Sequence, residues 1–196
     1  MPDSLDFILR FLIFAAVHSL LAIPRLKQQL RELTGLNAHW YRLTYNVLSL
    51  VLFGWVVLAW QSTRVIYLVP GVWNLVMQGL QGLSLIAMLL CLRQTGLGRF
   101  LGFTPESAGQ DSLTTTGCHA VVRHPLYLLG LLFFLLNPVM TTRWLTLTVI
   151  GTAYVIIGGL VEERRLLRQF GTSYARYQQN VPFLLPRLRL KAPSAD

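Results

Sequence analysis

The chain has 196 residues, of which 54% are hydrophobic and 13% charged, and its mean hydropathy is +0.52. Soluble domains are about 45–50% apolar and about 25% charged, so this composition excludes an ordinary water-soluble surface and indicates burial in a bilayer. Seventeen Lys and Arg residues against eight Asp and Glu residues give a formal charge of +9. The low charge content also argues against disorder, and the length favours one domain.

Five apolar runs are candidate transmembrane helices, because a helix needs about 17–25 residues to cross hydrocarbon. They lie at about residues 5–23, 43–61, 72–92, 126–141 and 144–161. The fourth and fifth runs are joined by a very short connection, which predicts an antiparallel helical hairpin. Gly158-Gly159 in the last run should let helices approach closely. The fold class is therefore expected to be all-α, a polytopic membrane protein with about five transmembrane helices.

The predicted organisation is a single membrane domain over residues 1–196. Residues 1–92 form a three-helix N-terminal part, and residues 93–196 hold a loop, the helical hairpin and a tail. Asp3 and Asp6 lie near the N-terminus, where a signal peptide has a basic cluster, so no cleaved signal peptide is expected. His18 and Ser19 lie inside the first run, where they form either a hydrogen-bonded pair within the bundle or part of a ligand site.

The basic residues are distributed unevenly along the chain. Fourteen of the 17 fall on one side of the predicted spans: Arg25, Lys27, Arg31, Arg42, Arg93, Arg99, Arg123, Arg164, Arg165, Arg168, Arg176, Arg187, Arg189 and Lys191. The positive-inside rule then predicts an outside N-terminus and a cytoplasmic tail, in a bacterial inner membrane. Contact with anionic membrane lipids explains this charge, so no nucleic-acid partner is expected.

Cysteine and histidine are sparse. Cys91 and Cys118 lie on the predicted cytoplasmic side and imply no disulfide framework. His119 and His124 are five residues apart, which does not match the spacing of paired metal ligands on a helix. No metal site is expected.

Polar residues concentrate in two segments, at residues 113–127 and at residues 162–182. The hairpin returns the chain to its starting side, so both segments should meet at one membrane boundary. Each also has a simpler explanation, because Pro125 suits the first turn of a helix and Glu162-Glu163 could balance the arginines that follow. A carboxylate at the end of an apolar helix nevertheless calls for a cationic partner.

The motifs in these segments follow a recognisable order. They read Thr115-Thr116-Gly117, Arg123-His124-Pro125-Leu126-Tyr127, Glu162-Glu163 with Leu166, Phe170-Gly171 with Tyr174 and Tyr177, and Val181-Pro182. Their order around a hairpin resembles the isoprenylcysteine carboxyl methyltransferase-like family of integral membrane methyltransferases, which includes phospholipid and methanethiol methyltransferases. The segments 18–21 and 41–46 are also similar to the openings of methanethiol methyltransferases and NnrU membrane proteins.

This resemblance implies that S-adenosylmethionine binds at the cytoplasmic surface between the fourth and fifth helices and the tail. The matching positions imply cofactor contacts at Leu113, Thr114, His119, His124, Pro125, Leu126, Tyr127 and Glu162, and catalytic roles for Arg123 and Glu163. Two positions depart from the family. His119 stands where a tyrosine is usual, and Gly158 replaces an arginine that prenylcysteine enzymes use for the substrate carboxylate.

The residue types suit methyl transfer from a sulfonium cofactor that carries a carboxylate and an amine, because carboxylate and cationic side chains complement those groups. The leading hypothesis is S-adenosylmethionine-dependent methylation of a small thiol, a lipid or another apolar acceptor. The alternative is a non-enzymatic NnrU-like membrane factor that assists a respiratory or transport system. The sequence leaves open the acceptor, the oligomeric state and the proton acceptor, for which His124, His119 and Glu163 are candidates.

Overall fold

Four long apolar helices dominate the computed structural model, which describes residues 2–59, 63–101, 103 and 113–187. They are α1 (Pro2–Ala22), α3 (Ala38–Leu58), α4 (Gly71–Thr95) and α7 (Thr142–Phe170), and each is long and apolar enough to cross a membrane. The predicted class, a helical polytopic membrane protein, is confirmed. The end of the second predicted run, at residues 60–61, lies outside the described residues.

The fourth predicted run forms a shorter helix than expected. Helix α6 (Pro125–Leu135) has 11 residues, and the chain then passes Asn137-Pro138 into strand β2 (Val139–Thr141). Strand β2 pairs antiparallel with β1 (Val65–Leu68), which lies in the connection before α4. The hairpin of α6 and α7 is therefore present as predicted, but a strand occupies its turn, and α6 is too short to span hydrocarbon without a thinned bilayer.

Local signals explain where the helices begin and end. The side chain of Asn37 accepts a hydrogen bond from the Trp40 amide at the start of α3, and Thr141 does the same for Trp144 at the start of α7. Gly96 caps the C-terminus of α4, and its φ of 92° is a conformation that favours glycine. The shorter elements are α2 (Pro24–Thr34), α5 (Leu97–Leu101), the 3₁₀ helix η1 (Gly117–Ala120) and α8 (Thr172–Asn180).

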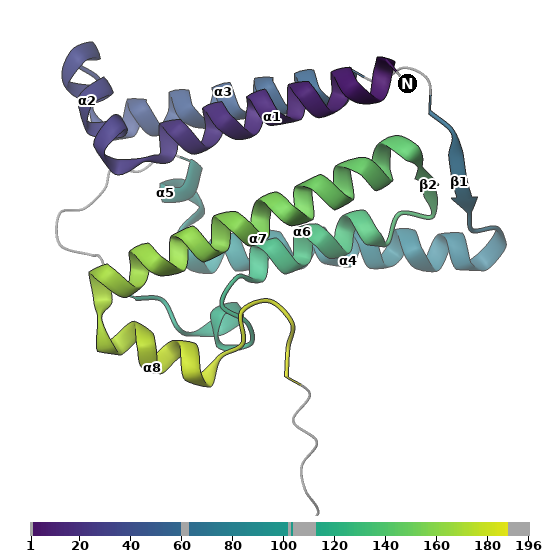
Figure 1. Cartoon of the computed structure of the whole chain (residues 1–196). Coiled ribbons are helices and arrows are strands. Elements are labelled where there is room, and N and C mark those ends of the chain that lie inside the picture. The colour runs from purple at the N-terminus through teal and green to yellow at the C-terminus, as the bar shows by residue number, and fades with distance from the viewer. Residues whose placement is uncertain (1, 60–62, 102, 104–112, 188–196) are drawn as a thin grey trace, which may run out of the picture.

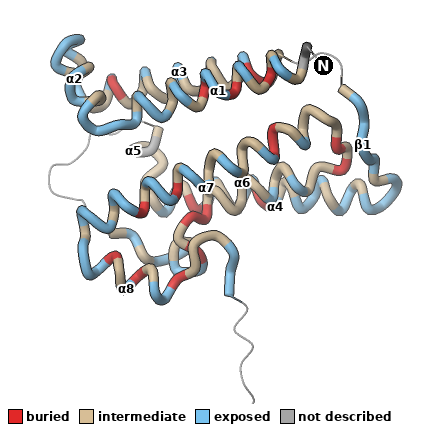
Figure 2. The backbone as a smooth tube through the Cα atoms, viewed as in Figure 1, coloured by how far each residue is buried: buried red, intermediate tan, exposed pale blue. Residues whose placement is uncertain are grey.

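The long helices form two layers. Helices α1 and α3 lie side by side, and α7, α6 and α4 make up the second layer, as Figure 1 shows. Between the layers, Phe7, Phe11 and Phe14 of α1 pack with Val56 of α3 and Leu147 of α7. The outward faces are largely exposed (Figure 2) and rich in Leu, Ile and Val, as expected for helices that contact lipid.

The path of the chain brings the polar segments to one end of the bundle. Helix α4 ends, α6 begins and α7 ends at this side, where η1 and α8 also lie (Figure 1). The β1–β2 pair lies at the opposite end. The predicted meeting of the two polar segments is confirmed, and we call the end at which they meet the site end.

Candidate functional site

Arg123 and Glu163 form a buried ion pair at the centre of the site end. The Nε atom of Arg123 donates to Oε1 of Glu163 at 2.5 Å, and Nη2 donates to Oε2 at 3.1 Å. The side chains are only 11% and 9% exposed. A two-point contact of this kind fixes the orientation of both groups and satisfies most of the carboxylate.

Arg123 also docks the tail of the chain. Its Nη1 atom donates to the carbonyl oxygens of Gln178 and Val181, at 2.9 and 2.5 Å. The backbone amides of Arg123 and His124 donate to the carbonyls of Pro182 and Phe183, at 2.9 and 3.1 Å. The start of α6 therefore holds the segment after α8 by both side-chain and backbone hydrogen bonds.

His124 lies between the two adjacent glutamates. Its Nε2 atom is 3.3 Å from Oε1 of Glu163, and its Nδ1 atom is 3.8 Å from Oε2 of Glu162. Because an ionised carboxylate only accepts hydrogen bonds, Nε2 carries a proton in this arrangement. The imidazole stacks on the ring of Tyr127, with centroids 5.1 Å apart, and contacts Phe183 on another side.

Glu162 differs from Glu163 in its surroundings. The Tyr127 hydroxyl donates to its Oε2 atom at 3.2 Å, and the Arg165 guanidinium lies 3.9 Å from its Oε1 atom. Its side chain is 37% exposed, whereas that of Glu163 is 9% exposed and also receives a hydrogen bond from Gln178. Helix α7 continues to Phe170, so Glu162 does not lie at the end of its helix, where the helix dipole would disfavour a carboxylate.

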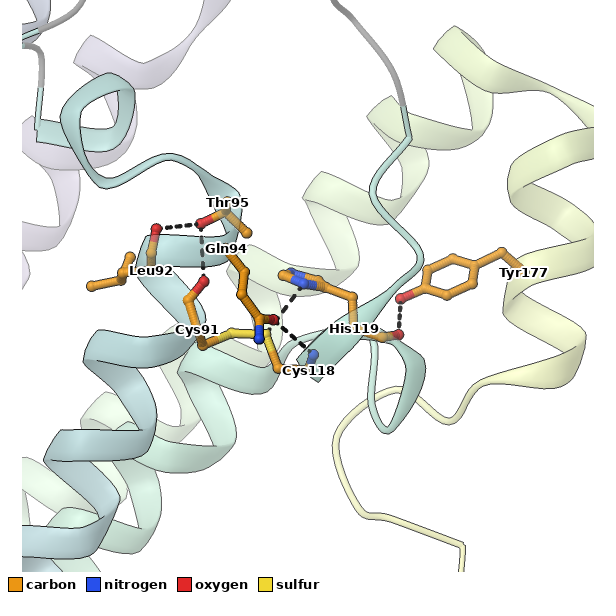
Figure 3. Close-up of a disulfide and its surroundings, with 7 residues drawn as sticks. All are labelled: Cys91, Leu92, Gln94, Thr95, Cys118, His119 and Tyr177. Carbon is orange, nitrogen blue, oxygen red and sulfur yellow. Dashed lines mark hydrogen bonds between the residues drawn. A yellow bond between two sulfur atoms is a disulfide. The ribbon is translucent and has the colours of Figure 1, made fainter.

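A disulfide joins α4 to η1, between Cys91 and Cys118 (Figure 3). The expectation that these cysteines form no disulfide is wrong, because the end of α4 lies against η1 with the two Cα atoms 5.9 Å apart. Gln94 of α4 strengthens the junction by accepting a hydrogen bond from the Cys118 amide. The Cys91, Cys118 and His119 ligand atoms lie within 4.8 Å of one another, but sulfurs bonded to each other are not available as thiolate ligands.

The next residue, His119, is held from the opposite side by α8. The Tyr177 hydroxyl donates to the His119 carbonyl at 2.6 Å (Figure 3). Burial raises the pKa of Tyr177 to about 12, so this hydroxyl keeps its proton. Burial and the neighbouring His124 lower the pKa of His119, against the opposing effect of Glu162. His119 is therefore neutral at pH 7.

The structure brings most of the predicted site residues together. Arg123, His124 and Glu163 contact one another, Tyr127 joins Glu162, and Pro125 is buried in the first turn of α6. Leu113 packs against the cluster of Tyr174, Tyr177 and Val181, whereas the next residue, Thr114, is exposed. Leu126 faces inward between helices.

Two participants were not predicted, namely Gln178 and Phe183. Phe183 follows the Val181-Pro182 motif, which is the one sequence signal that could have indicated it. A Cβ atom at Gly159 would lie 2.8 Å from Cζ of Phe183 and 3.4 Å from the Tyr127 ring. The expectation that Gly158-Gly159 permits close approach is thus met at Gly159, where the neighbours are the tail and α6.

The fold and the site together define a helical membrane protein with a charged cluster at one membrane boundary. A family model described as "NnrU protein" matches residues 6–158. Methanethiol S-methyltransferase 2 of Bradyrhizobium diazoefficiens is 31% identical, over 94% of this chain and 73% of the relative. Methanethiol S-methyltransferase of Pseudomonas deceptionensis is 32% identical, over 96% of this chain and 75% of the relative. No solved structure matches the chain significantly.

The class is thus an integral membrane methyltransferase, as the motif order predicted. The chain belongs to the NnrU family. The family model ends before Glu162, whereas both relatives are aligned over more than nine-tenths of the chain and are named as methyltransferases. These matches favour the enzyme over the non-enzymatic alternative.

Proposed function

We propose that the protein transfers a methyl group from S-adenosylmethionine to the sulfur of a small thiol, at the site end of the bundle. One observation supports this proposal more strongly than the others. The carboxylate of Glu162 is partly exposed, whereas that of its neighbour Glu163 is buried and hydrogen-bonded. The chain that carries this pair aligns almost end to end with methanethiol S-methyltransferases.

The side chains around Glu162 fit the proposed cofactor. Its carboxylate accepts a hydrogen bond from Tyr127, and His124 and Arg165 lie further away at 3.8 and 3.9 Å, so it retains lone pairs for an ammonium group. Arg165 is 57% exposed and is available to a carboxylate. The stacked rings of His124 and Tyr127 provide an aromatic face suited to a cation or a heterocycle. The resemblance also implies cofactor contacts at His119 of η1 and at Leu113 and Thr114, which precede η1.

When bound, S-adenosylmethionine supplies an electrophilic methyl group on a positively charged sulfur. The thiol sulfur forms the new S–C bond with one lone pair while the donor S–C bond breaks, which leaves a neutral thioether. The S–H bond of the acceptor breaks, and its proton passes to the neutral imidazole of His119, one of the candidate proton acceptors. An imidazole suffices as the acceptor, because a methylated sulfur that still carries its proton is strongly acidic. The residues mainly align the partners and exclude water.

For Arg123 and Glu163, which the motifs matched as catalytic, the contacts favour a positioning role. The two side chains are hydrogen-bonded to each other, and Arg123 also donates to two backbone carbonyls of the tail. Their pairing fixes His124 and the tail residue Phe183 beside the aromatic face that is proposed to contact the cofactor. The basic residues at the same end support a cytoplasmic site in a bacterial inner membrane.

The test uses the full-length protein purified in detergent. Glu162→Gln should weaken S-adenosylhomocysteine binding, measured by calorimetry, by at least about tenfold, because a charge-assisted contact contributes about 1.5–3 kcal/mol. It should also lower the formation of dimethyl sulfide from methanethiol. Glu32→Gln, the same chemical change at an exposed position of α2, is the matched control and should change neither quantity.

Unaltered S-adenosylhomocysteine affinity in folded Glu162→Gln protein would contradict the cofactor site. Wild-type protein that binds the cofactor product but methylates no thiol would contradict the acceptor class. If the same assay shows methylation of phospholipids or prenylcysteine, the acceptor is a lipid instead of a small thiol.

A further inference from the structure

A cavity of about 240 Å³ lies between the two helical layers, directly beside the site described above. Phe11 and Phe14 of α1, Phe53 of α3 and Leu147 of α7 line it from several sides. Leu126, Tyr127 and Leu131 of α6 form another wall. The cavity therefore draws its lining from helices of both halves of the chain.

The polar atoms of the lining side chains are engaged elsewhere. Thr148 and Thr152 donate their hydroxyls to backbone carbonyls one turn earlier in α7, at 2.7 and 2.6 Å. The Tyr154 hydroxyl pairs with Ser19, and the Tyr127 hydroxyl donates to Glu162. What remains facing the cavity is aromatic and aliphatic carbon, and such cavities stay dry and bind small apolar molecules.

The size of the cavity limits its occupant. An engineered apolar cavity of about 150 Å³ holds one benzene molecule, whereas sites for drug-sized ligands measure about 300–1,000 Å³. A volume of about 240 Å³ accommodates a thiol of one to a few carbons.

Tyr127 connects the cavity with the cofactor cluster. Its ring lines the cavity and stacks on His124, and its hydroxyl contacts Glu162. We propose that this cavity is the acceptor site, in which a short alkanethiol lies between the α1–α3 and α6–α7 helices with its sulfur toward Tyr127. This inference rests on the proposed function and adds where the acceptor binds and what limits its length.

The first test fills the cavity. Gly151 of α7 lines it, and a Cβ atom there would meet no described heavy atom within 4 Å. Gly151→Leu should lower kcat/KM for methanethiol at least about tenfold, mainly through KM, since single methylenes in such pockets change kcat/KM about 10–200-fold. S-adenosylhomocysteine affinity should stay at the wild-type value. Gly82→Leu on α4, where a Cβ also has open space, is the matched control.

The second test enlarges the cavity. Leu131→Ala removes bulk from the α6 wall. It should therefore raise kcat/KM for butanethiol about tenfold relative to kcat/KM for methanethiol. Equal thiol kinetics in wild type, Gly151→Leu and Leu131→Ala would overturn the assignment.

A binding measurement separates this inference from the proposed function. Dimethyl sulfide, observed by saturation-transfer NMR, should bind wild-type protein and Gly82→Leu but not Gly151→Leu. If wild type is inactive on thiols but shows this pattern, the proposed function fails and the acceptor role falls with it, although the cavity still binds a small thioether. If Gly151→Leu binds dimethyl sulfide as wild type does, the cavity assignment fails whatever the activity.

Discussion

Two polar clusters of this protein occupy different depths and use different chemistry. At the site end, Arg123 and Glu163 are charged and hold the tail through a network of hydrogen bonds. Inside the helical bundle, His18 of α1 contacts the Tyr45 hydroxyl at 2.8 Å and the Ser49 hydroxyl at 2.9 Å, both from α3. We call these the boundary cluster and the intramembrane cluster.

The difference follows from the solvent around each cluster. A buried ion pair is costly to break, because removal of one partner leaves an unpaired charge, at about 3–5 kcal/mol. Hydrogen bonds between neutral groups within membranes contribute about 0.6 kcal/mol on average and about 1.7 at most. The boundary cluster should therefore control folding of the site, and the intramembrane cluster should adjust only the packing of α1 on α3.

The largest expected effect comes from Glu163→Gln. The substitution leaves the Arg123 guanidinium without its charged partner, so we expect a loss of about 3–5 kcal/mol in the free energy of unfolding. S-adenosylhomocysteine binding should be lost with it. Thermal unfolding in detergent, followed by circular dichroism, measures the first quantity, and calorimetry measures the second.

Glu162→Gln is the natural comparison for Glu163→Gln, since it makes the same change one residue earlier in α7. It should lower cofactor affinity while leaving the melting temperature at the wild-type value. If both variants lose the same stability, the contrast between an open and a structural glutamate is wrong.

Reduction of the Cys91–Cys118 disulfide should have the next largest effect. The bond closes a loop across a sequence separation of 27, for which the chain-entropy model gives about 3.5 kcal/mol. The orientation proposed from the basic residues puts this bond on the cytoplasmic side, where stable disulfides are rare and reducible ones often respond to redox state. Dithiothreitol should therefore lower both the melting temperature and S-adenosylhomocysteine affinity, because the bond fixes η1, which carries His119, against α4.

Cys91→Ser with Cys118→Ser is the control for this experiment. The double variant should behave as the reduced wild type and show no further response to dithiothreitol. A dithiothreitol effect of equal size in the double variant would show that the reductant acts elsewhere.

Much of this arrangement was predictable, because the spans depend on local hydropathy and the hairpin brings residues 113–127 and 162–182 to one side. The ion pair of Arg123 with Glu163 follows from charge once those segments meet. The β1–β2 pairing and the disulfide were not predictable in the same way, since each joins segments separated by a whole helix or a long loop. Gln178 and Phe183 contribute through the docking of the tail, which depends on backbone carbonyls that carry no sequence signal.

The intramembrane cluster should respond weakly to mutation. His18→Phe removes both contacts with α3 but leaves Ser49 bonded to the Tyr45 carbonyl, so we expect a loss of about 0.6–1.7 kcal/mol. Cofactor affinity should not change. Melting temperature and calorimetry test this, with Ser49→Ala as the companion variant. Loss of S-adenosylhomocysteine binding in His18→Phe would instead support the ligand role considered for His18.

The smallest expected effect is a pH dependence at His119. Burial and His124 hold its pKa below 6.5 in the folded protein, whereas the unfolded chain has the ordinary value of about 6.5. The unfolded state therefore binds more protons, and the contribution of His119 to stability is fully present above about pH 6.5 and decreases as the pH falls below it. His119→Gln should reduce the decrease in melting temperature between about pH 7.5 and about pH 5.5. An identical pH profile in this variant would show that the titration of other groups controls the acid sensitivity.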